Sequence, residues 1–241
     1  MAPATPARSR RSALTAVAVL VLAAAVAVVV VLATSGGSAR TPAVANRARV
    51  ASMLRGIPQS GYTLGNPNAP VTVTEYGDLI CPACGRFALG SEAQLISSEV
   101  RAGKVKLVYR GFMSGETANA AQYAAAQVAA RAAGLQDRAW YYVLLFYAAQ
   151  RNPAVPYVTT AYLQRVASEV PGLDFAKWKK DLKDRSLDYA IVADGQKAIA
   201  DDVIQTPTII VKGSSGSARF RDPKTSVPSI AQLRGLIARV K

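Results

Sequence analysis

The cysteine pair in "DLICPACG" (residues 78–85) most limits what this chain can fold into. Cys81 and Cys84 are the only cysteines among 241 residues, and the chain contains no histidine. Two thiols cannot fill a four-thiolate metal site within one chain, and a small disulfide-stapled scaffold would be far richer in cysteine. The lack of histidine excludes Ser-His-Asp hydrolases, Cys-His proteases and histidine-based zinc or iron sites. We therefore expect neither a metal nor another bound cofactor.

The segments around the pair predict an α/β fold. Residues 71–76 ("VTVTEY") alternate β-branched side chains and predict a strand, residues 84–100 a helix, and residues 104–109 ("KVKLVY") a second strand. A strand–helix–strand unit normally pairs its strands in parallel. After a helical block, strands are expected at 208–211 and 218–221, followed by a helix that begins near Pro228. Within the block, helices are expected at 116–133, 137–150, 159–169 and 175–192, the last capped by Asp174.

The amino-terminal segment predicts a membrane anchor. Residues 13–33 form an uncharged and almost wholly apolar run, which as a helix would be about 30 Å long and match a bilayer core. Three arginines precede it, so residues 1–12 are expected to be a cytoplasmic tail. Residues 34–60 are interpreted as a tether, and a small-residue site near Ala39 leaves cleavage and secretion open. The domain at 61–241 would then lie outside the cytoplasmic membrane.

The net charge of +14 favours a membrane surface over nucleic acid as a partner. Nucleic-acid binding would need basic residues gathered in a patch or stripe. Here they are scattered, and the densest run, "KWKKDLKDR" (177–185), is interrupted by acids. We expect no nucleic acid as a partner, and contact with the membrane through the amino-terminal helix.

Two cysteines two residues apart, between a strand and a helix, suit thiol–disulfide exchange. Cys81 would lie at the helix amino terminus, where unpaired N–H groups and the helix dipole stabilise a thiolate. Cys84 follows within one turn and can resolve a mixed disulfide. Pro82 is tolerated because the first turn has no hydrogen bond to lose. Half of a zinc site shared across a dimer, or an inert pair, are the alternatives that spacing alone leaves open.

Two stretches extend this interpretation to a family. The sequence "YTLGNPNAPVTVTEYGDLICPACGRF" (62–87) resembles the opening of the DsbA-like thiol–disulfide oxidoreductases, and "VIQTPTIIVKG" (203–213) resembles their second signature. The resemblance covers residues 61–241. It implies a thioredoxin-like fold with an inserted helical subdomain at about 114–203.

The resemblance also implies roles for individual residues. Cys81 would be the attacking, solvent-facing sulfur and Cys84 the buried resolving one, with Pro207 as a cis proline facing them. Thr206 would offer its backbone to an extended substrate, beside Pro82 and Ala83. Glu75, six residues before Cys81, matches an acid beneath the active site that could relay a proton to Cys84. The alternatives are an ordinary trans proline and a partly exposed strand-end glutamate.

One departure from the family concerns redox potential. The strongest oxidants carry Cys-Pro-His-Cys, whereas Ala83 replaces the histidine here and removes a cation and a hydrogen-bond donor. We expect a membrane-anchored dithiol oxidase that passes its disulfide to secreted or envelope proteins and is reoxidised by a quinone-linked membrane partner. A reductase or isomerase of the same fold, or a non-catalytic envelope protein-binding module, are the alternatives.

Overall fold

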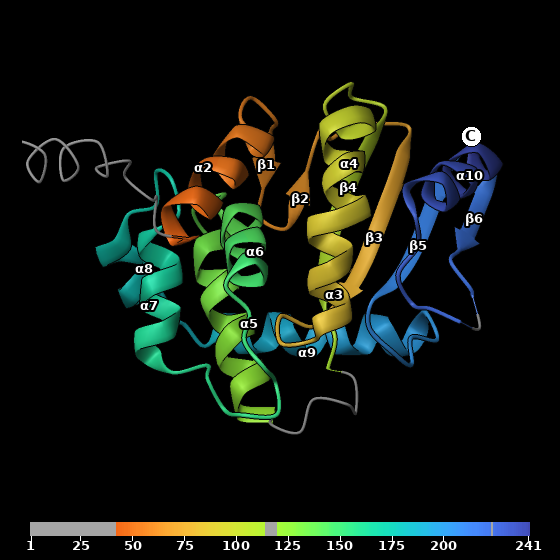
Figure 1. The fold of residues 1–241 in the computed structure, drawn as a ribbon. Coiled ribbons are helices and arrows are strands. Elements are labelled where there is room, and N and C mark those ends of the chain that lie inside the picture. The colour runs from red at the N-terminus through yellow and green to blue at the C-terminus, as the bar shows by residue number, and fades with distance from the viewer. Residues whose placement is uncertain (1–41, 114–119, 223) are drawn as a thin grey trace, which may run out of the picture. The chain divides into compact units, whose positions relative to one another are not determined.

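The computed structural model describes residues 42–113, 120–222 and 224–241 (Figure 1). These residues form a six-stranded sheet with the order β1-β2-β4-β3-β5-β6. Only β3 and β4 pair in parallel, and the other neighbours are antiparallel. The strands are β1 (Gln59–Ser60), β2 (Thr63–Leu64), β3 (Val71–Gly77), β4 (Val105–Gly111), β5 (Thr208–Gly213) and β6 (Gly216–Arg219). The predicted α/β fold is confirmed, and the sheet is mixed.

A long helical run follows β3 and connects it to β4. It consists of α3 (Pro82–Phe87), a π-helical turn η1 (Ala88–Glu92), α4 (Ala93–Leu95) and a second π turn η2 (Ile96–Val100). This run and α10 (Ile230–Val240) cover the sheet in Figure 1, with α10 against β5 and β6. The remaining helices are α2 (Pro42–Leu54), α5 (Ala120–Gly134), α6 (Ala139–Ala148), α7 (Thr160–Ser168), α8 (Phe175–Asp181) and α9 (Ser186–Ala200).

The alternation of β3 divides the core between the two faces of the sheet. Val71 and Val73 are buried in the main core, together with the helical run after β3 and the helices α5 to α7. Tyr76 points the other way and packs with Ala198, Val203 and Ile210 in a smaller cluster. Because side chains in a strand alternate between faces, Glu75 lies on the main-core face, beneath the helical run that carries the cysteines.

The helix expected at 175–192 is in fact two helices. Asp174 caps α8 as predicted, since its Oδ1 accepts from the N–H of Lys177 at 2.9 Å. Helix α8 ends at Asp181, and α9 begins at Ser186. Because of this break, the two helices contact different parts of the fold. Trp178 enters the core, where its Nε1 donates to the carbonyl of Ala129 at 2.9 Å, whereas α9 contacts α5 and β4.

The tether expected at 34–60 is wrong for its second half. Residues 42–54 form α2, which packs on α6 and η2 and buries Val50 and Leu54. Arg101 fixes its end by donating to the carbonyls of Met53 at 2.7 Å and Arg55 at 3.0 Å. The apolar side chains of a short segment rich in arginine and alanine became part of the core, so the fold begins before residue 61.

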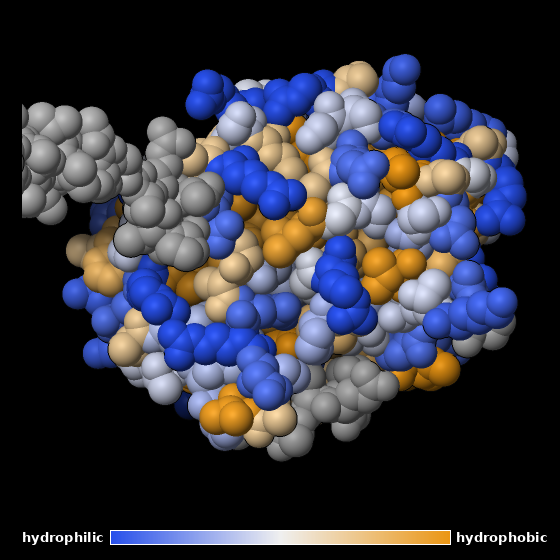
Figure 2. All heavy atoms as spheres, in the orientation of Figure 1, coloured by the Kyte–Doolittle hydropathy of each residue, from blue (hydrophilic) through white to orange (hydrophobic). Residues whose placement is uncertain are grey.

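The expected membrane span, residues 13–33, lies outside the described residues, as do the cytoplasmic tail and residues 34–41. Among the helices between residues 42 and 241 that the structure describes, none combines the length and the apolar character needed to cross a bilayer. On the face shown in Figure 2, hydrophilic residues lie between apolar ones over all the visible elements.

Candidate active site

The cysteine loop leaves the carboxyl end of β3 and turns directly into α3. Cys81 is the residue before the helix, with an extended backbone (φ −68°, ψ 121°), and Pro82 occupies the first turn. The N–H of Cys81 donates to the carbonyl of Asp78 at 3.0 Å, and the Cys81 carbonyl accepts from the N–H of Gly85 at 3.2 Å. The sequence therefore places Cys81 where the free N–H groups of a helix amino terminus gather.

Two polar side chains that the sequence analysis did not assign hold this loop. Asp78 is buried, and its Oδ1 accepts from the N–H of Ile80 at 2.9 Å. Gln150, just after α6, donates its Nε2 to the carbonyls of Leu79 at 2.7 Å and Cys81 at 3.1 Å. The Gln150 side chain crosses so close to Gly85 that a Cβ there would overlap it. These contacts hold the backbone of the cysteine loop in place.

The two sulfurs have opposite electrostatic environments. Both cysteines are free thiols, with 4% of Cys81 and 0% of Cys84 exposed. A hydrogen bond from the Cys84 thiol, aided by the backbone N–H groups of Cys84 and Ala83, lowers the pKa of Cys81 to about 6. Burial raises the pKa of Cys84 well above its usual value. At neutral pH the site therefore holds a thiolate at Cys81 and a thiol at Cys84.

The second predicted signature lies directly beside the first. The Thr206–Pro207 peptide bond is cis, as expected from the sequence. The carbonyl oxygen of Thr206 is 3.7 Å from Sγ of Cys81, although 125 residues separate them. Thr206 and Pro207 are buried, Ala83 is half-buried and Pro82 is exposed. Cys81 is the more accessible sulfur, but its 4% exposure is far smaller than the expected solvent-facing position implies.

Glu75 lies on the main-core face of β3, opposite Tyr109 of β4 and Ile209 of β5. It is 1% exposed, so the alternative of a partly exposed strand-end glutamate is wrong. Burial, together with the neighbouring Glu92, raises the pKa of Glu75 well above its usual value. Glu92, in η1, is also 1% exposed and was not predicted as a site residue. The site thus has a second layer of buried acids beneath the thiols.

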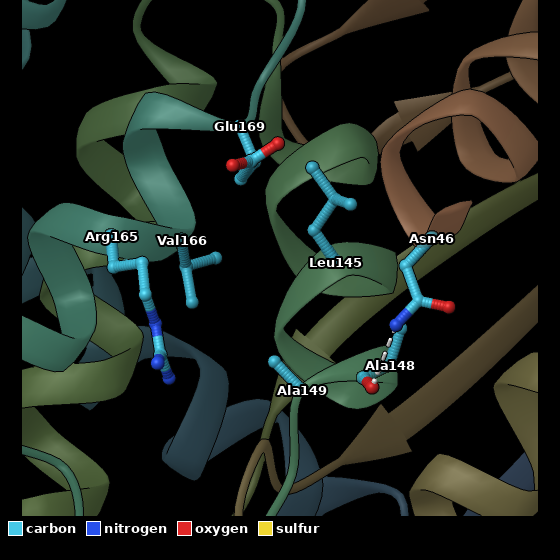
Figure 3. A pocket seen from close by; sticks show the side chains of 7 residues that line it. All are labelled: Asn46, Leu145, Ala148, Ala149, Arg165, Val166 and Glu169. Atoms are coloured by element: carbon cyan, nitrogen blue, oxygen red, sulfur yellow. Dashed lines mark hydrogen bonds between the residues drawn. The ribbon is translucent and has the colours of Figure 1, made fainter. Parts of the chain in front are cut away.

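A pocket of about 190 Å³ lies elsewhere, between α2, α6 and α7 (Figure 3). In Figure 3 the Asn46 side chain reaches from α2 to the carbonyl of Ala148, an interaction of 3.2 Å. The pocket is lined by Asn46, Leu145, Ala148, Ala149, Arg165, Val166 and Glu169. It includes none of the predicted site residues. Across the described part of the chain, no group of three or more cysteine, aspartate or glutamate side chains is placed to hold a metal ion.

Comparisons with known proteins agree with this geometry. A thioredoxin family model matches residues 59–225. A probable disulfide bond formation protein D of Bacillus anthracis is 26% identical over 167 residues, which is 68% of this chain and 76% of the relative. Among solved structures, BdbD from Bacillus subtilis matches with a TM-score of 0.64 and 20% identity, over 76% of this chain and 96% of that one. Wolbachia pipientis alpha-DsbA1 matches with a TM-score of 0.59 and 18% identity, over 78% and 92% of the two chains.

Proposed function

We propose that this chain, which belongs to the thioredoxin family, is a thiol–disulfide oxidoreductase that oxidises pairs of thiols in other proteins. One observation carries the proposal. Cys81 begins a helix beside the carbonyl of Thr206, and its pKa is lowered to about 6, whereas Cys84 is fully buried. A passive pair of thiols needs no such difference. The relative named disulfide bond formation protein D supports the same chemistry.

The proposed reaction begins with the disulfide form of the pair. A client thiolate attacks Sγ of Cys81, a client–Cys81 bond forms, the Cys81–Cys84 bond breaks, and Cys84 leaves as a thiolate that takes up a proton. The second client thiolate then attacks the client sulfur of the mixed disulfide and displaces Cys81 as a thiolate. Two electrons pass from the client to the enzyme. The low pKa of Cys81 makes it a good leaving group in this second step.

The direction of the reaction is the finer part of the proposal. A stabilised Cys81 thiolate favours the reduced form of the enzyme, and an enzyme with a stable reduced form is an oxidant. No histidine contributes to this stabilisation, since position 83 is alanine; the pKa of Cys81 is lowered by the Cys84 thiol, the Thr206 side chain and the backbone N–H groups of Cys84 and Ala83. A reductase or isomerase would have the same cysteines with a higher Cys81 pKa. We therefore place oxidation of clients ahead of reduction.

The location is proposed from the sequence. An anchor at residues 13–33, with the domain on the extracytoplasmic side, would give the enzyme access to secreted and envelope proteins as they fold. Reoxidation would come from a membrane partner of the quinone-linked type, because the enzyme must return two electrons after each client. Secretion after cleavage near Ala39 is the alternative, and immunoblotting of membrane and medium fractions with an antibody to the domain distinguishes the two.

Trapping of mixed disulfides tests the activity. In a Cys84→Ala variant the Cys81 thiolate can still attack an oxidised client, which is the reverse of the second step, but Cys84 is absent and cannot resolve the resulting mixed disulfide. Client complexes should therefore accumulate on non-reducing gels and vanish when a reductant is added. The matched control, Cys81→Ala, removes the attacked sulfur and should trap none. Equal trapping by both variants, or by neither, would refute the reaction. A reduction potential near about −120 mV would support the oxidase, and one near about −270 mV the reductase.

A further inference from the structure

Glu75 and Glu92 form a pair of buried carboxyl groups beneath the cysteines, and the proposed function does not explain why there are two. We propose that Glu92 is a positioning residue that holds Glu75 in a proton-sharing carboxyl pair, and that this pair exchanges a proton with Cys84 in each cycle. The inference rests on the proposed function, since it concerns the proton that Cys84 gains and loses.

The first support is the absence of other hydrogen-bond partners. Both side chains are 1% exposed. Among the described residues, no donor reaches either oxygen of Glu75 or Oε2 of Glu92. The two carboxyl groups instead interact with each other, and the neighbouring Glu92 helps to raise the pKa of Glu75. Two ionised carboxylates have only acceptors, so a hydrogen bond between them would require at least one proton. Two buried carboxyl groups without other donors therefore favour a protonated pair, as in other sites where two neighbouring carboxylates do not both ionise.

The second support is the lack of a counter-charge. The charged groups that act on Glu75 are Glu92 and Cys81, both of them acids. Tyr109 and Tyr147 face the pair from β4 and α6, and each is influenced by Glu75 and Cys84 together. No lysine or arginine is among these neighbours. Burying an ionised carboxylate without a cation costs free energy. If the two carboxyl groups share a proton, the site can carry one negative charge at a lower cost.

The position of the pair links it to the buried sulfur. Gly77 lies two residues after Glu75, and a Cβ there would be 2.8 Å from Oε1 of Glu75 and 3.1 Å from Oη of Tyr147. The next residue, Asp78, donates its N–H to Sγ of Cys84 at 3.4 Å, and its carbonyl accepts from Oη of Tyr147 at 3.4 Å. Glu75, Tyr147 and the Cys84 sulfur therefore surround one short segment at the end of β3.

The proton balance of the proposed step is simple. When the client thiolate breaks the Cys81–Cys84 bond, the Cys84 thiolate takes one proton from the doubly protonated pair. The pair is left with one proton between two oxygens and one negative charge, in a charge-assisted hydrogen bond of the strong kind. When Cys84 attacks a mixed disulfide in the reverse direction, its proton returns to the pair. Without Glu92, Glu75 would become an isolated buried anion, and the transfer would be harder.

A carboxyl titration tests the pair directly and independently of activity. The full chain, reduced and in detergent, is labelled with ¹³C at the glutamate carboxyl groups, and the signals are followed against pH. Two coupled signals should titrate above the ordinary glutamate value of about 4.3. Glu92→Gln should leave only the Glu75 signal. This signal should titrate at a lower pH than in the unmodified protein, because the glutamine amide can donate a hydrogen bond to the Glu75 carboxylate. Glu92→Leu, which provides no donor, should raise the pH at which Glu75 titrates. Two independent signals near 4.3 would overturn the proposal.

Kinetics then test the role. Attack of Cys84 on a Cys81–glutathione mixed disulfide is followed by stopped flow against pH. Glu92→Leu should slow the step by about tenfold or more and shift its pH midpoint, with partial rescue in Glu92→Gln. In a Glu75→Gln background, changing Glu92 should have little further effect. A full additional loss there would show that Glu92 does not act through Glu75.

The matched control is Glu99→Gln, the same change on the same helical run at a partly exposed carboxylate that pairs with Arg234 at 2.7 Å. It should leave the rate and its pH profile unchanged. The two proposals fail separately. If mixed disulfides never form but the carboxyl signals titrate together at high pH, the pair stands and the oxidoreductase proposal fails. If exchange is normal in Glu92→Leu at every pH, the positioning role fails alone.

Discussion

This protein has two buried acidic sites, and they differ in the groups that surround the carboxyl side chains. Asp194, on α9, is 7% exposed and is surrounded by donors. Its oxygens accept from Arg110 at 2.8 Å, from the N–H of Gly111 at 3.1 Å, and from Arg131 in a second ion pair. Glu75 and Glu92 are buried more deeply, yet among the described residues no donor reaches either oxygen of Glu75 or Oε2 of Glu92.

The difference separates a carboxylate with a structural role from carboxyl groups that are suited to proton exchange. Asp194 joins β4, α5 and α9 through its contacts with two arginines and the N–H of Gly111, so its role is to hold these elements together. The glutamate pair has no cation, so it keeps its protons and can release one when a neighbouring charge changes. The same residue chemistry thus serves anchoring in one region and proton exchange in the other, and the surrounding donors decide which.

The largest expected effect comes from breaking the anchored site. Asp194→Asn keeps the size of the side chain but leaves two arginines without their carboxylate, one of them 10% exposed. Removing one partner of a buried ion pair costs about 3–5 kcal/mol, and we expect a loss of that order in urea unfolding of the reduced protein. Asp181→Asn, at an exposed pair with Lys177, is the control and should change stability by about 0.5 kcal/mol or less.

Adding a methyl group beside Glu75 should lower the free energy of unfolding by less than Asp194→Asn does. In Gly77→Ala the new methyl group would lie 2.8 Å from Oε1 of Glu75 and 2.8 Å from Cε2 of Tyr109. Overpacking of this kind costs about 1–3 kcal/mol, measured by thermal or urea unfolding. The displaced carboxyl should also change the pH profile of Cys84 attack. Gly90→Ala, where a Cβ would meet nothing within 4 Å, is the matched control and should not reproduce either effect.

Neutralising the glutamate pair should stabilise the fold, which is the reverse of the result at Asp194. The folded-state pKa of Glu92 is raised by burial, so the unfolded chain releases its proton first and stability falls as pH rises above about 4.3. Glu92→Gln removes this penalty. We expect a gain of about 1–2 kcal/mol that grows between pH 5 and pH 8, measured by urea unfolding at several pH values. A loss of stability that is the same at all pH values would contradict the comparison.

The smallest effect is expected from adding a donor at the cysteines. Reduced Cys81 should titrate with a midpoint near pH 6, followed by its thiolate absorbance. Because this folded-state pKa is lowered, the thiolate contribution to stability is present above the unfolded value of about 8.5 and is lost as pH falls through 6. Ala83→His should lower the midpoint further and raise the potential by about 30 mV for each 1.4 kcal/mol of added thiolate stabilisation. Ala83→Gln should do less, because it brings no charge.

Local patterns were sufficient to predict the frame of the site. Alternating β-branched residues located β3, the spacing of Cys81 and Cys84 placed one thiol at the helix start, and resemblance to a family predicted the cis bond at Pro207 and the burial of Glu75. Asp174 was correctly assigned as a cap. Each of these features depends on neighbouring residues or on a quoted motif, so a single sequence is enough to find it.

The features that were missed depend on distant contacts. Asp194 meets its arginines across 84 and 63 residues, and Gln150 supports a loop 69 residues away. Glu92 lies in a π turn, where hydrogen bonds run from residue i to i+5, so a period of 3.6 residues does not predict which side chains face the sheet. The packing of α2 was missed because a segment rich in arginine and alanine has only a few apolar side chains to signal its burial.

The docking of α2 has a consequence for the reach of the enzyme. The first described helix begins at Pro42, and the membrane span expected from the sequence ends at residue 33, so eight residues, 34–41, separate the two in the sequence. Eight residues can extend to at most about 29 Å. If the enzyme is anchored by residues 13–33 as proposed, so short a connection would keep it from reaching the whole depth of the envelope. It would work in the thin layer next to the bilayer, on polypeptides that have just crossed it.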